Sequence, residues 1–280
     1  MPRRQHQALE LLQCNINHSA RAQDLLLQHL AEWGISAAIV SEPYFVPPLP
    51  TWVGDTEGEV GMTIPRMGDR PPLVKQSAGR GYVAARWGDM ILVAVYFAPS
   101  RPRREFERLL LEVGRIVAGA APTPVVVAGD FNAKSPVWGS PVTDLRGRIL
   151  SDWVVASGLC VLNQGTADTC VRWNGGSIVD VSFATPSAAA RVTGWRVLGD
   201  VETLSDHLYV RMSVSRPASV RPPSQGRNLP RDRFRKWSLA SLDADSAEEA
   251  AMIERWRTPS PDRSLDVEER ACRFRASLVA

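Results

Sequence analysis

The sequence has few cysteines, and they lack the spacing of a metal site. Its 280 residues contain four cysteines, at positions 14, 160, 170 and 272. Structural zinc sites pair cysteines about two to four residues apart. A signal peptide and an apolar run of membrane length are also absent from the sequence. We therefore expect neither a zinc finger nor a secreted disulfide scaffold, but an intracellular protein with reduced cysteines.

A strong excess of positive charge is missing as well. The net charge is +3 and the isoelectric point is near 8.8, which does not by itself indicate a nucleic-acid-binding protein. Lysine is scarce, because only positions 75, 134 and 236 hold it and every other basic side chain is arginine or histidine. Arginine can bind phosphate through two parallel hydrogen bonds, but the base composition of the gene explains this bias equally well.

Hydrophobic residues make up 44% of the chain, which is enough for one large core. Strand-like patterns at 9–14, 37–40, 81–87 and 91–97 alternate with helix-like patterns at 22–33, 106–117 and 145–154. Residues 169–184, with Asn174, Gly175 and Gly176 at their centre, are typical of a β-hairpin. Two stacked sheets with outer helices would need about this much sequence.

The composition changes after Val214. Residues 216–226 are rich in proline, arginine and serine and hold too few apolar side chains to build a core. We expect residues 1–215 to form one domain, 216–236 to form a linker, and 237–280 to begin a region that connects to a further domain.

The most informative segment is Val125–Ala133, in which an apolar run precedes two polar residues. The run from Val125 to Ala128 predicts a buried strand, and Gly129 allows the backbone to turn as the strand ends. Asp130 and Asn132 alternate with a phenylalanine, so both polar side chains face one side of a continuing strand. A carboxylate and an amide placed there can orient a water molecule or hold an anionic substrate. An ordinary turn after a core strand explains this motif equally well.

Three more polar groups stand at predicted strand ends. Glu42 follows one apolar run, Asp180 interrupts another, and the pair Asp206–His207 precedes a third. Each of these has an ordinary explanation as a turn residue or an outward-facing strand residue. Together with Asp130 and Asn132, they favour an active site.

The whole set of polar residues resembles the endonuclease/exonuclease/phosphatase superfamily from about residue 9 to residue 214. The residues that carry this resemblance, in chain order, are Asn15, Glu42, Tyr96, Asp130, Asn132, Asp180, Asp206 and His207. Within that superfamily the sequence is most similar to the endonuclease domains of LINE-type (non-LTR) retrotransposons. The similar segments are Leu12–Asn15, Ser41–Pro43, Tyr96–Pro99, Trp138–Gly139, Asp144–Gly147 and Ile178–Val181. Among the lineages, it most resembles arthropod elements, several of which insert at fixed sites in ribosomal genes or telomeric repeats.

The resemblance implies a fold and an activity. The fold is α/β, a four-layer sandwich of two packed mixed β-sheets flanked by helices, as in DNase and apurinic endonucleases. The activity is a Mg²⁺-dependent DNA endonuclease that nicks one strand of double-stranded DNA, in the nucleus, to leave a 3′-hydroxyl that primes reverse transcription. A downstream reverse transcriptase would bring the element RNA as a second partner. The alternatives are an abasic-site repair nuclease, a phosphatase of the same fold, and a non-catalytic DNA-binding module.

The resemblance also implies roles for the polar residues. Asp130 activates the attacking water, and Asn132 fixes that water or the phosphate. His207, kept protonated by Asp180, binds a phosphate oxygen, and Asp206 either lies near the metal or supports this network.

The metal site and the tyrosine complete the set. Glu42 and Asn15 are the expected ligands of Mg²⁺, for which Mn²⁺ could substitute. Tyr96 is the expected catalytic tyrosine. The family usually has one residue between this tyrosine and the following proline, whereas Tyr96 and Pro99 are separated by two. The extra residue would turn Tyr96 away and put Phe97 in its place unless a bulge absorbs it.

Two groups of residues are candidates for DNA contact. Arg101, Arg103 and Arg104 follow the strand of Tyr96 and could reach phosphates, or could form a solvated helix start. At the hairpin tip the candidates are Arg172, Trp173 and Asn174, because a protruding hairpin can probe groove width or wedge into a base step. Turn chemistry alone also accounts for Asn174.

We predict that Trp173→Ala changes the choice of cleavage site more than the nicking rate. Mapping nicks along plasmid DNA for the parent and the variant measures both quantities. Equal losses of rate on target and random DNA would contradict the prediction.

Overall fold

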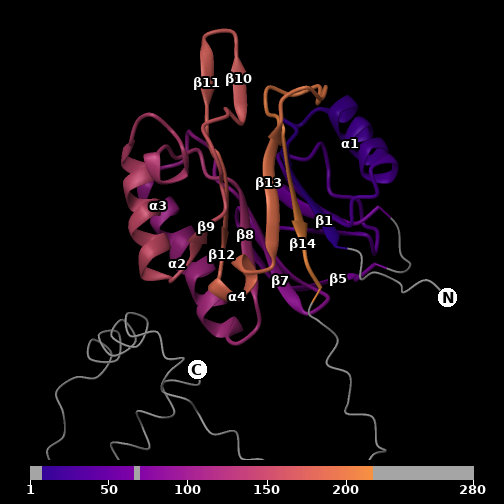
Figure 1. Ribbon diagram of the computed structural model, residues 1–280, viewed down its shortest axis with the longest axis horizontal. Helices are drawn as coiled ribbons and strands as arrows, with labels where there is room; N and C mark the ends of the chain where they lie inside the picture. The colour runs from indigo at the N-terminus through magenta and orange to yellow at the C-terminus, as the bar shows by residue number, and fades with distance from the viewer. Residues whose placement is uncertain (1–7, 66–69, 217–280) are drawn as a thin grey trace, which may run out of the picture. The chain divides into compact units, whose positions relative to one another are not determined.

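The computed structural model describes residues 8–65 and 70–216 (Figure 1). The predicted connecting region, and the predicted linker apart from its first residue, lie outside these ranges. Two six-stranded mixed sheets pack face to face, and helices cover their outer faces. The predicted four-layer α/β sandwich is therefore confirmed. Among the helices of the described ranges, none combines the length and the apolar character needed to cross a membrane.

The first sheet has the strand order β13-β14-β1-β2-β4-β3. Its strands are β1 (Leu9–Asn15), β2 (Ala37–Ser41), β3 (Trp52–Gly54), β4 (Val60–Thr63), β13 (Val192–Leu198) and β14 (Tyr209–Val214). β1 and β2 are parallel, and helix α1 (Ala20–Glu32) connects them. The helix begins at Ser19, whose side chain accepts a hydrogen bond from the backbone N–H of Ala22. Its apolar face, with Leu26 and Leu30, packs on the outer side of this sheet.

The second sheet has the strand order β5-β6-β7-β8-β12-β9. Its strands are β5 (Leu73–Gly79), β6 (Tyr82–Trp87), β7 (Met90–Tyr96), β8 (Val125–Asp130), β9 (Cys160–Val161) and β12 (Asp180–Ala184). Helices α2 (Arg103–Ala120) and α3 (Leu145–Ala156) cover its outer face through residues such as Phe106 and Leu150. Two short helices, η1 (Pro136–Trp138) and α4 (Pro186–Ala189), lie in the connections.

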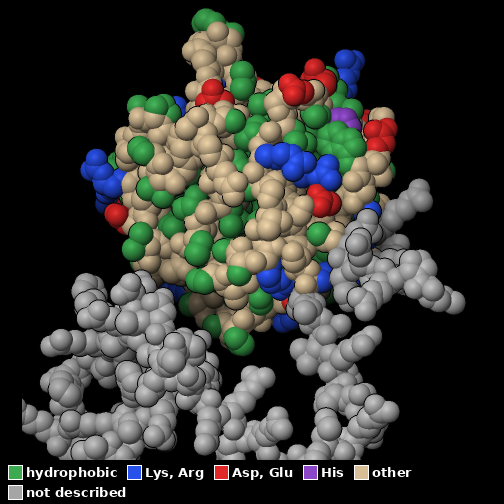
Figure 2. Space-filling model, viewed as in Figure 1, with side chains coloured by type: hydrophobic (Ala, Val, Ile, Leu, Met, Phe, Trp, Pro, Cys, Tyr) green, Lys and Arg blue, Asp and Glu red, His purple; other side chains and the backbone are tan. Residues whose placement is uncertain are grey.

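A separate hairpin projects from the body of the domain at the top of Figure 1. It consists of β10 (Cys170–Arg172) and β11 (Gly175–Ser177). This hairpin is shorter than the predicted one over 169–184, because Asp180–Ala184 leave it to pair with β8 in the second sheet. The space-filling view shows the hairpin as a narrow stalk that stands clear of the sandwich (Figure 2).

Strand alternation places polar residues between the sheets at one edge of the sandwich. On β1, Leu11 lies in the core between the sheets, whereas Leu12 and Cys14 pack against α1. Because side chains alternate, Gln13 and Asn15 share the inner face with Leu11. On β8, Ala128 belongs to the same inner core, so Asp130 also faces inward.

Gln13 is a fully buried polar residue that connects the two sheets. Its side-chain amide donates a hydrogen bond to the carbonyl of Gly129 at 3.1 Å, and its amide oxygen accepts one from Ser182 at 2.8 Å. The Ser182 hydroxyl in turn accepts a bond from the indole of Trp195 at 3.1 Å. Both the nitrogen and the oxygen of the Gln13 side chain thus have a hydrogen-bond partner on the second sheet, which offsets the cost of burying them and holds the sheets together next to Asp130.

We predict that Gly129→Ala destabilises the fold by roughly 3 kcal/mol or more. Gly129 has φ +151°, and a Cβ atom there would overlap the backbone carbonyl of Val95 on the neighbouring strand. Gly119→Ala is the matched control, because no atom lies within 4 Å of the added methyl group. Urea unfolding measures both free energies. A Gly129→Ala protein as stable as the control would show that the β7–β8 contact is looser than the structure has it.

Candidate active site

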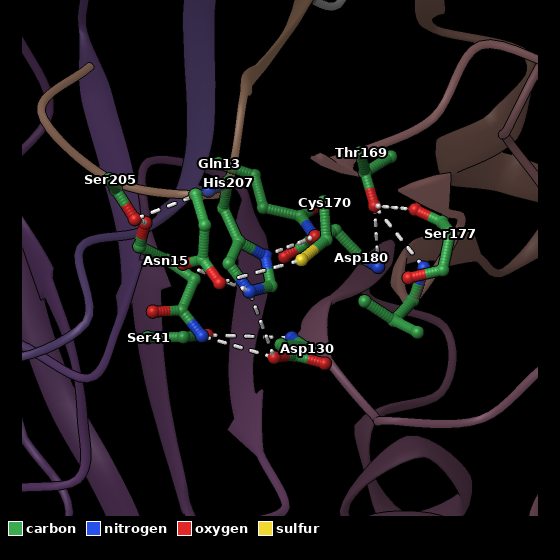
Figure 3. A network of polar contacts seen from close by, with 12 residues as sticks. Gln13, Asn15, Ser41, Asp130, Thr169, Cys170, Ser177, Asp180, Ser205 and His207 are labelled. Carbon is green, nitrogen blue, oxygen red and sulfur yellow. Dashed lines mark hydrogen bonds and ion pairs between the residues drawn. The ribbon is translucent and has the colours of Figure 1, made fainter. Parts of the chain in front are cut away.

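The predicted polar residues meet at the edge where β1, β2, β7 and β8 all end. Figure 3 shows four of them, Asn15, Asp130, Asp180 and His207. The structure brings together all eight residues of the predicted constellation: Asn15, Glu42, Tyr96, Asp130, Asn132, Asp180, Asp206 and His207. Their roles remain predictions, but their convergence from four strands and three loops is a feature of this structure.

Asn15 connects the two sheets at the centre of the site. Its side-chain nitrogen donates hydrogen bonds to Glu42 at 2.8 Å and to Asp130 at 3.0 Å. Its oxygen accepts a bond from the backbone N–H of Asn17 at 2.9 Å. Asn15 therefore turns its nitrogen toward Glu42 and holds that carboxylate in place, and its role as a ligand of the cation stays a prediction.

Tyr96 reaches the site in spite of the extra residue that follows it. Its hydroxyl donates a hydrogen bond of 2.6 Å to Glu42. The pairing of β7 with both neighbours runs without a bulge, and Tyr96 is the direct partner of Asp130 in the parallel register. Phe97 faces the opposite way and packs on Phe106 of α2. Burial, followed by the bond to Glu42, raises the pKa of Tyr96, so the tyrosine remains a donor.

Asp130 is buried and held by Asn132. The backbone N–H of Asn132 donates to one carboxylate oxygen at 2.8 Å, and its side-chain nitrogen donates to the other at 3.2 Å. Asn132 adopts φ +46°, the left-handed conformation that asparagine tolerates better than most residues. Burial and then the negative charge of Asp180 raise the pKa of Asp130 to about 7. Asp130 can therefore exchange a proton near neutral pH.

His207 and Asp180 form a buried ion pair. The Nδ1 atom of His207 lies 2.8 Å from an oxygen of Asp180. Burial alone would lower the pKa of His207, but the charge and hydrogen bond of Asp180 outweigh it and raise the pKa. The other ring nitrogen, Nε2, lies 4.0 Å from both Asp130 and Asp206. A protonated His207 thus turns an N–H toward the space between these two carboxylates.

The projecting hairpin is anchored directly to the Asp206–His207 segment. Cys170 forms an isolated β-bridge with His207, and the backbone N–H of Val171 donates to the carbonyl of Asp206 at 2.7 Å. The Arg172 guanidinium donates to the Asp206 carboxylate, also at 2.7 Å. At the tip, the Trp173 side chain is 98% exposed. Of the predicted hairpin contacts, Trp173 and Asn174 are free toward solvent, whereas Arg172 holds Asp206.

The prediction that Arg101 contacts phosphate does not fit the structure. Its side chain is largely buried, lies over the Phe97 ring at 4.6 Å, and pairs with Glu105 at 3.0 Å. The partner Glu59, at 3.6 Å, comes from a distant loop that sequence spacing could not connect to Arg101. Arg101 therefore fixes the start of α2.

The two neighbouring arginines remain exposed on the first turn of α2. Arg103 forms a surface pair with Glu107 at 3.4 Å, and Arg104 faces solvent. A surface pair of this kind contributes little to stability and can be exchanged for a phosphate contact.

Sequence reasoning missed several residues around the site. Arg146 on α3 donates to the backbone carbonyls of Ala98, Pro99 and Arg101, and so fixes the loop after Tyr96. His18 lies with its Nε2 atom 3.4 Å from Glu42. Arg146 lies in the segment 144–147, one of those that carried the family resemblance, so that segment could have indicated its importance. No pattern in the sequence indicated a role for His18.

The residues present fit a divalent cation. Glu42 offers a carboxylate held by two neutral donors, and a second cluster of possible ligands consists of Asp130, Asp180 and His207. One oxygen each of Asp180 and Asp206 is buried without a hydrogen-bond partner in the described part of the chain. Such an oxygen-rich and electron-rich site suits a hard cation.

Comparison with known proteins agrees with this geometry. Residues 90–211 match the family described as "Endonuclease-reverse transcriptase". Over 149 residues the chain is 29% identical to the "Putative 115 kDa protein in type-1 retrotransposable element R1DM" of Drosophila melanogaster. That match covers 50% of this chain and 14% of the length of the Drosophila protein.

Among solved structures, the chain is similar to the endonuclease domain of TRAS1, a telomere-specific non-LTR retrotransposon. The TM-score is 0.64 with 25% identity, covering 74% of this chain and 98% of the other. A 3′-5′ exonuclease from Neisseria meningitidis (TM-score 0.57, 16% identity, covering 74% and 100%) shares the fold. So does an AP endonuclease from Archaeoglobus fulgidus (TM-score 0.56, 14% identity, covering 74% and 99%).

The raised pKa of His207 predicts how stability depends on pH. A histidine whose pKa is higher in the folded state stabilises the fold fully below its unfolded pKa, near 6.5, and this contribution is lost as pH rises toward the folded pKa. In EDTA, the free energy of unfolding of the parent should therefore fall between pH 7 and 9, by up to roughly 1 kcal/mol per pH unit. His207→Gln should remove this part of the decline. Urea unfolding measures it, and parallel curves for parent and variant would refute the ion-pair description.

Proposed function

We propose that this chain, which is similar to the endonuclease domain of a non-LTR retrotransposon, is a Mg²⁺-dependent nickase of double-stranded DNA. The observation that carries the proposal is the convergence of Glu42, Asp130 and His207 at one sheet edge, each held by a neutral or oppositely charged partner. Hydrolysis of a phosphodiester needs a cation, a group that activates water, and a donor to the phosphate oxygens.

Glu42 is the residue that we assign to the cation. Tyr96 and Asn15 donate to its two oxygens at 2.6 and 2.8 Å and so fix the carboxylate at the mouth of the site. A bound Mg²⁺ would supply electrostatic stabilisation of the negative charge that develops on the phosphate. Mg²⁺ keeps several of its water ligands, which agrees with a site that offers few carboxylates, and Mn²⁺ could take its place.

Asp130 and His207 have complementary roles in the proposed reaction. The pKa of Asp130 near 7 suits a group that accepts a proton from the attacking water, and Asn132 keeps its carboxylate in one orientation. His207 keeps its proton because Asp180 stabilises the imidazolium, so Nε2 can donate to a non-bridging phosphate oxygen. Asp206, held by Arg172, supports His207 from the neighbouring position.

The proposed product is a nick with a free 3′-hydroxyl that primes reverse transcription at the target. The proposal includes action in the nucleus and a partnership with the element RNA through a downstream reverse transcriptase. We keep the predicted limits of the endonuclease domain at 1–215, of the linker at 216–236 and of the connecting region at 237–280.

The projecting hairpin favours a duplex-DNA nuclease over a phosphatase of the same fold. A small phosphate ester needs no contact so far from the catalytic residues, whereas Trp173 stands exposed at the end of a stalk anchored to His207. A non-catalytic binding module is also disfavoured, because it has no physical need for a buried cluster of charged groups such as Asp130, Asp180 and His207.

We predict that the full chain nicks supercoiled plasmid in Mg²⁺ but not in EDTA. His207→Ala and Asp130→Ala should each lower the rate at least about a hundredfold, because each removes a group from the reacting centre. The nicked ends should be extended by a DNA polymerase without further treatment. Val155→Ala, on an exposed position of α3, is the matched control and should nick at the parent's rate.

Nicking by the parent that persists in EDTA, or that survives both active-site substitutions, would contradict the proposed site. Nicks that a polymerase extends only after a 3′-phosphatase treatment would contradict the proposed product.

A further inference from the structure

Two aromatic side chains stand exposed directly after the proposed cation ligand. Tyr44 and Phe45 follow Glu42 by two and three residues, and they are 57% and 52% exposed. Their ring centroids lie 5.8 Å apart with the planes at 85°, so the rings pack edge to face on each other. We call this pair the aromatic ledge. Two adjacent aromatic rings that the core leaves exposed are available for a contact outside the fold.

The backbone of the ledge is fixed by one buried side chain. Gln23, in the first turn of α1, is 4% exposed. Its oxygen accepts hydrogen bonds from the backbone N–H groups of Tyr44 at 2.9 Å and Phe45 at 3.4 Å, and its nitrogen donates to the carbonyl of Phe45 at 3.1 Å. One glutamine thus satisfies three backbone groups, which holds the loop in a single conformation. A surface held in this way loses little conformational entropy when it binds a ligand.

The ledge and the hairpin belong to different sides of the site. Glu42 and the ledge follow β2 of the first sheet, and Gln23 ties the ledge to α1. In the turn before α1, the backbone N–H of His18 donates to the carbonyl of Glu42 at 2.8 Å. The hairpin with Trp173 leads into β12 of the second sheet. Exposed aromatic side chains are therefore attached to both sheets where they meet at the site.

We propose that the aromatic ledge of Tyr44 and Phe45 binds the target DNA through its nucleobases beside the position of the cut. This inference rests on the proposed function, because the occupant must be the DNA whose phosphate lies at Glu42. Aromatic side chains stack on unpaired bases or wedge between base pairs, and every base offers a face for this contact. The ledge has no cationic group of its own, so its contribution is distinct from that of the arginines on α2.

The test uses the full chain and DNA around a mapped nick. Plasmid nicks made by the parent in Mg²⁺ are first mapped, and a fluorescein-labelled duplex is built around the strongest nick. Affinity for this duplex is then measured by fluorescence anisotropy in EDTA over a series of salt concentrations. The variants are Tyr44→Ala, Phe45→Ala, their double variant, and the ring-retaining pair Tyr44→Phe and Phe45→Tyr. The matched control is Leu49→Ala, which removes an aliphatic side chain that is 54% exposed in the same loop.

We expect the double alanine variant to bind about tenfold or more weakly, given the usual size of aromatic–base stacking. The dependence of affinity on salt should stay unchanged, because the ledge neutralises no phosphate. The ring-retaining variants and Leu49→Ala should bind like the parent, and all should unfold at the parent's temperature. A 2-aminopurine base beside the nick should be quenched by the parent and not by the double variant.

A double alanine variant that binds DNA like the parent would overturn the proposed role of the ledge while leaving the proposed function intact. An equal loss in Leu49→Ala would also overturn it, since a general apolar effect would then suffice. A parent that neither nicks plasmid nor binds the duplex would overturn the proposed function itself, and the assignment of DNA to the ledge with it.

Discussion

The contact on which the site depends is the hydrogen-bonded bridge that Asn15 makes between Glu42 and Asp130. Glu42 comes directly after a strand of the first sheet, and Asp130 ends a strand of the second, so the bridge joins the two sheets. Asp130 is buried and Glu42 is partly buried, so both carboxylates lose hydration and need donors within the protein. The structure supplies them from Tyr96, Asn15 and Asn132. The same donors hold the carboxylates in the orientation that a cation and a phosphate would require, so the needs of folding and of chemistry coincide here.

The packing of the two sheets sets the distances within the site. Gln13, two residues before Asn15 on β1 of the first sheet, forms hydrogen bonds with Gly129 and Ser182 of the second sheet and so holds the two sheets together. On the outer side, Arg146 holds three carbonyls of the loop that follows Tyr96. The exposed elements that we assign to DNA are anchored to this rigid edge: the hairpin through His207, and the ledge through Gln23. These anchors limit how far the hairpin and the ledge can move relative to the catalytic groups.

Local sequence predicted the strand ends of the site well, because an apolar run followed by a polar residue records the point where a buried strand emerges. The fold, the hairpin and the constellation from Asn15 to His207 followed from such patterns together with a family resemblance. Contacts between distant segments were not visible. Gln13 and Gly129 are 116 residues apart, and Arg101 pairs with a glutamate of another loop. The direction of Tyr96 depended on whether β7 carries a bulge, and the hydrogen-bond register alone decides that.

The central claim is that Glu42, held by Tyr96 and Asn15, binds the cation that the nuclease uses. Anomalous X-ray scattering from crystals grown with Mn²⁺ locates the ion directly. We predict a peak at bonding distance from a Glu42 carboxylate oxygen, with the Tyr96 hydroxyl still beside it. A peak among Asp130, Asp180 and His207, with none at Glu42, would contradict this assignment and move the cation to the cluster that we interpret as the proton-transfer and phosphate-binding groups.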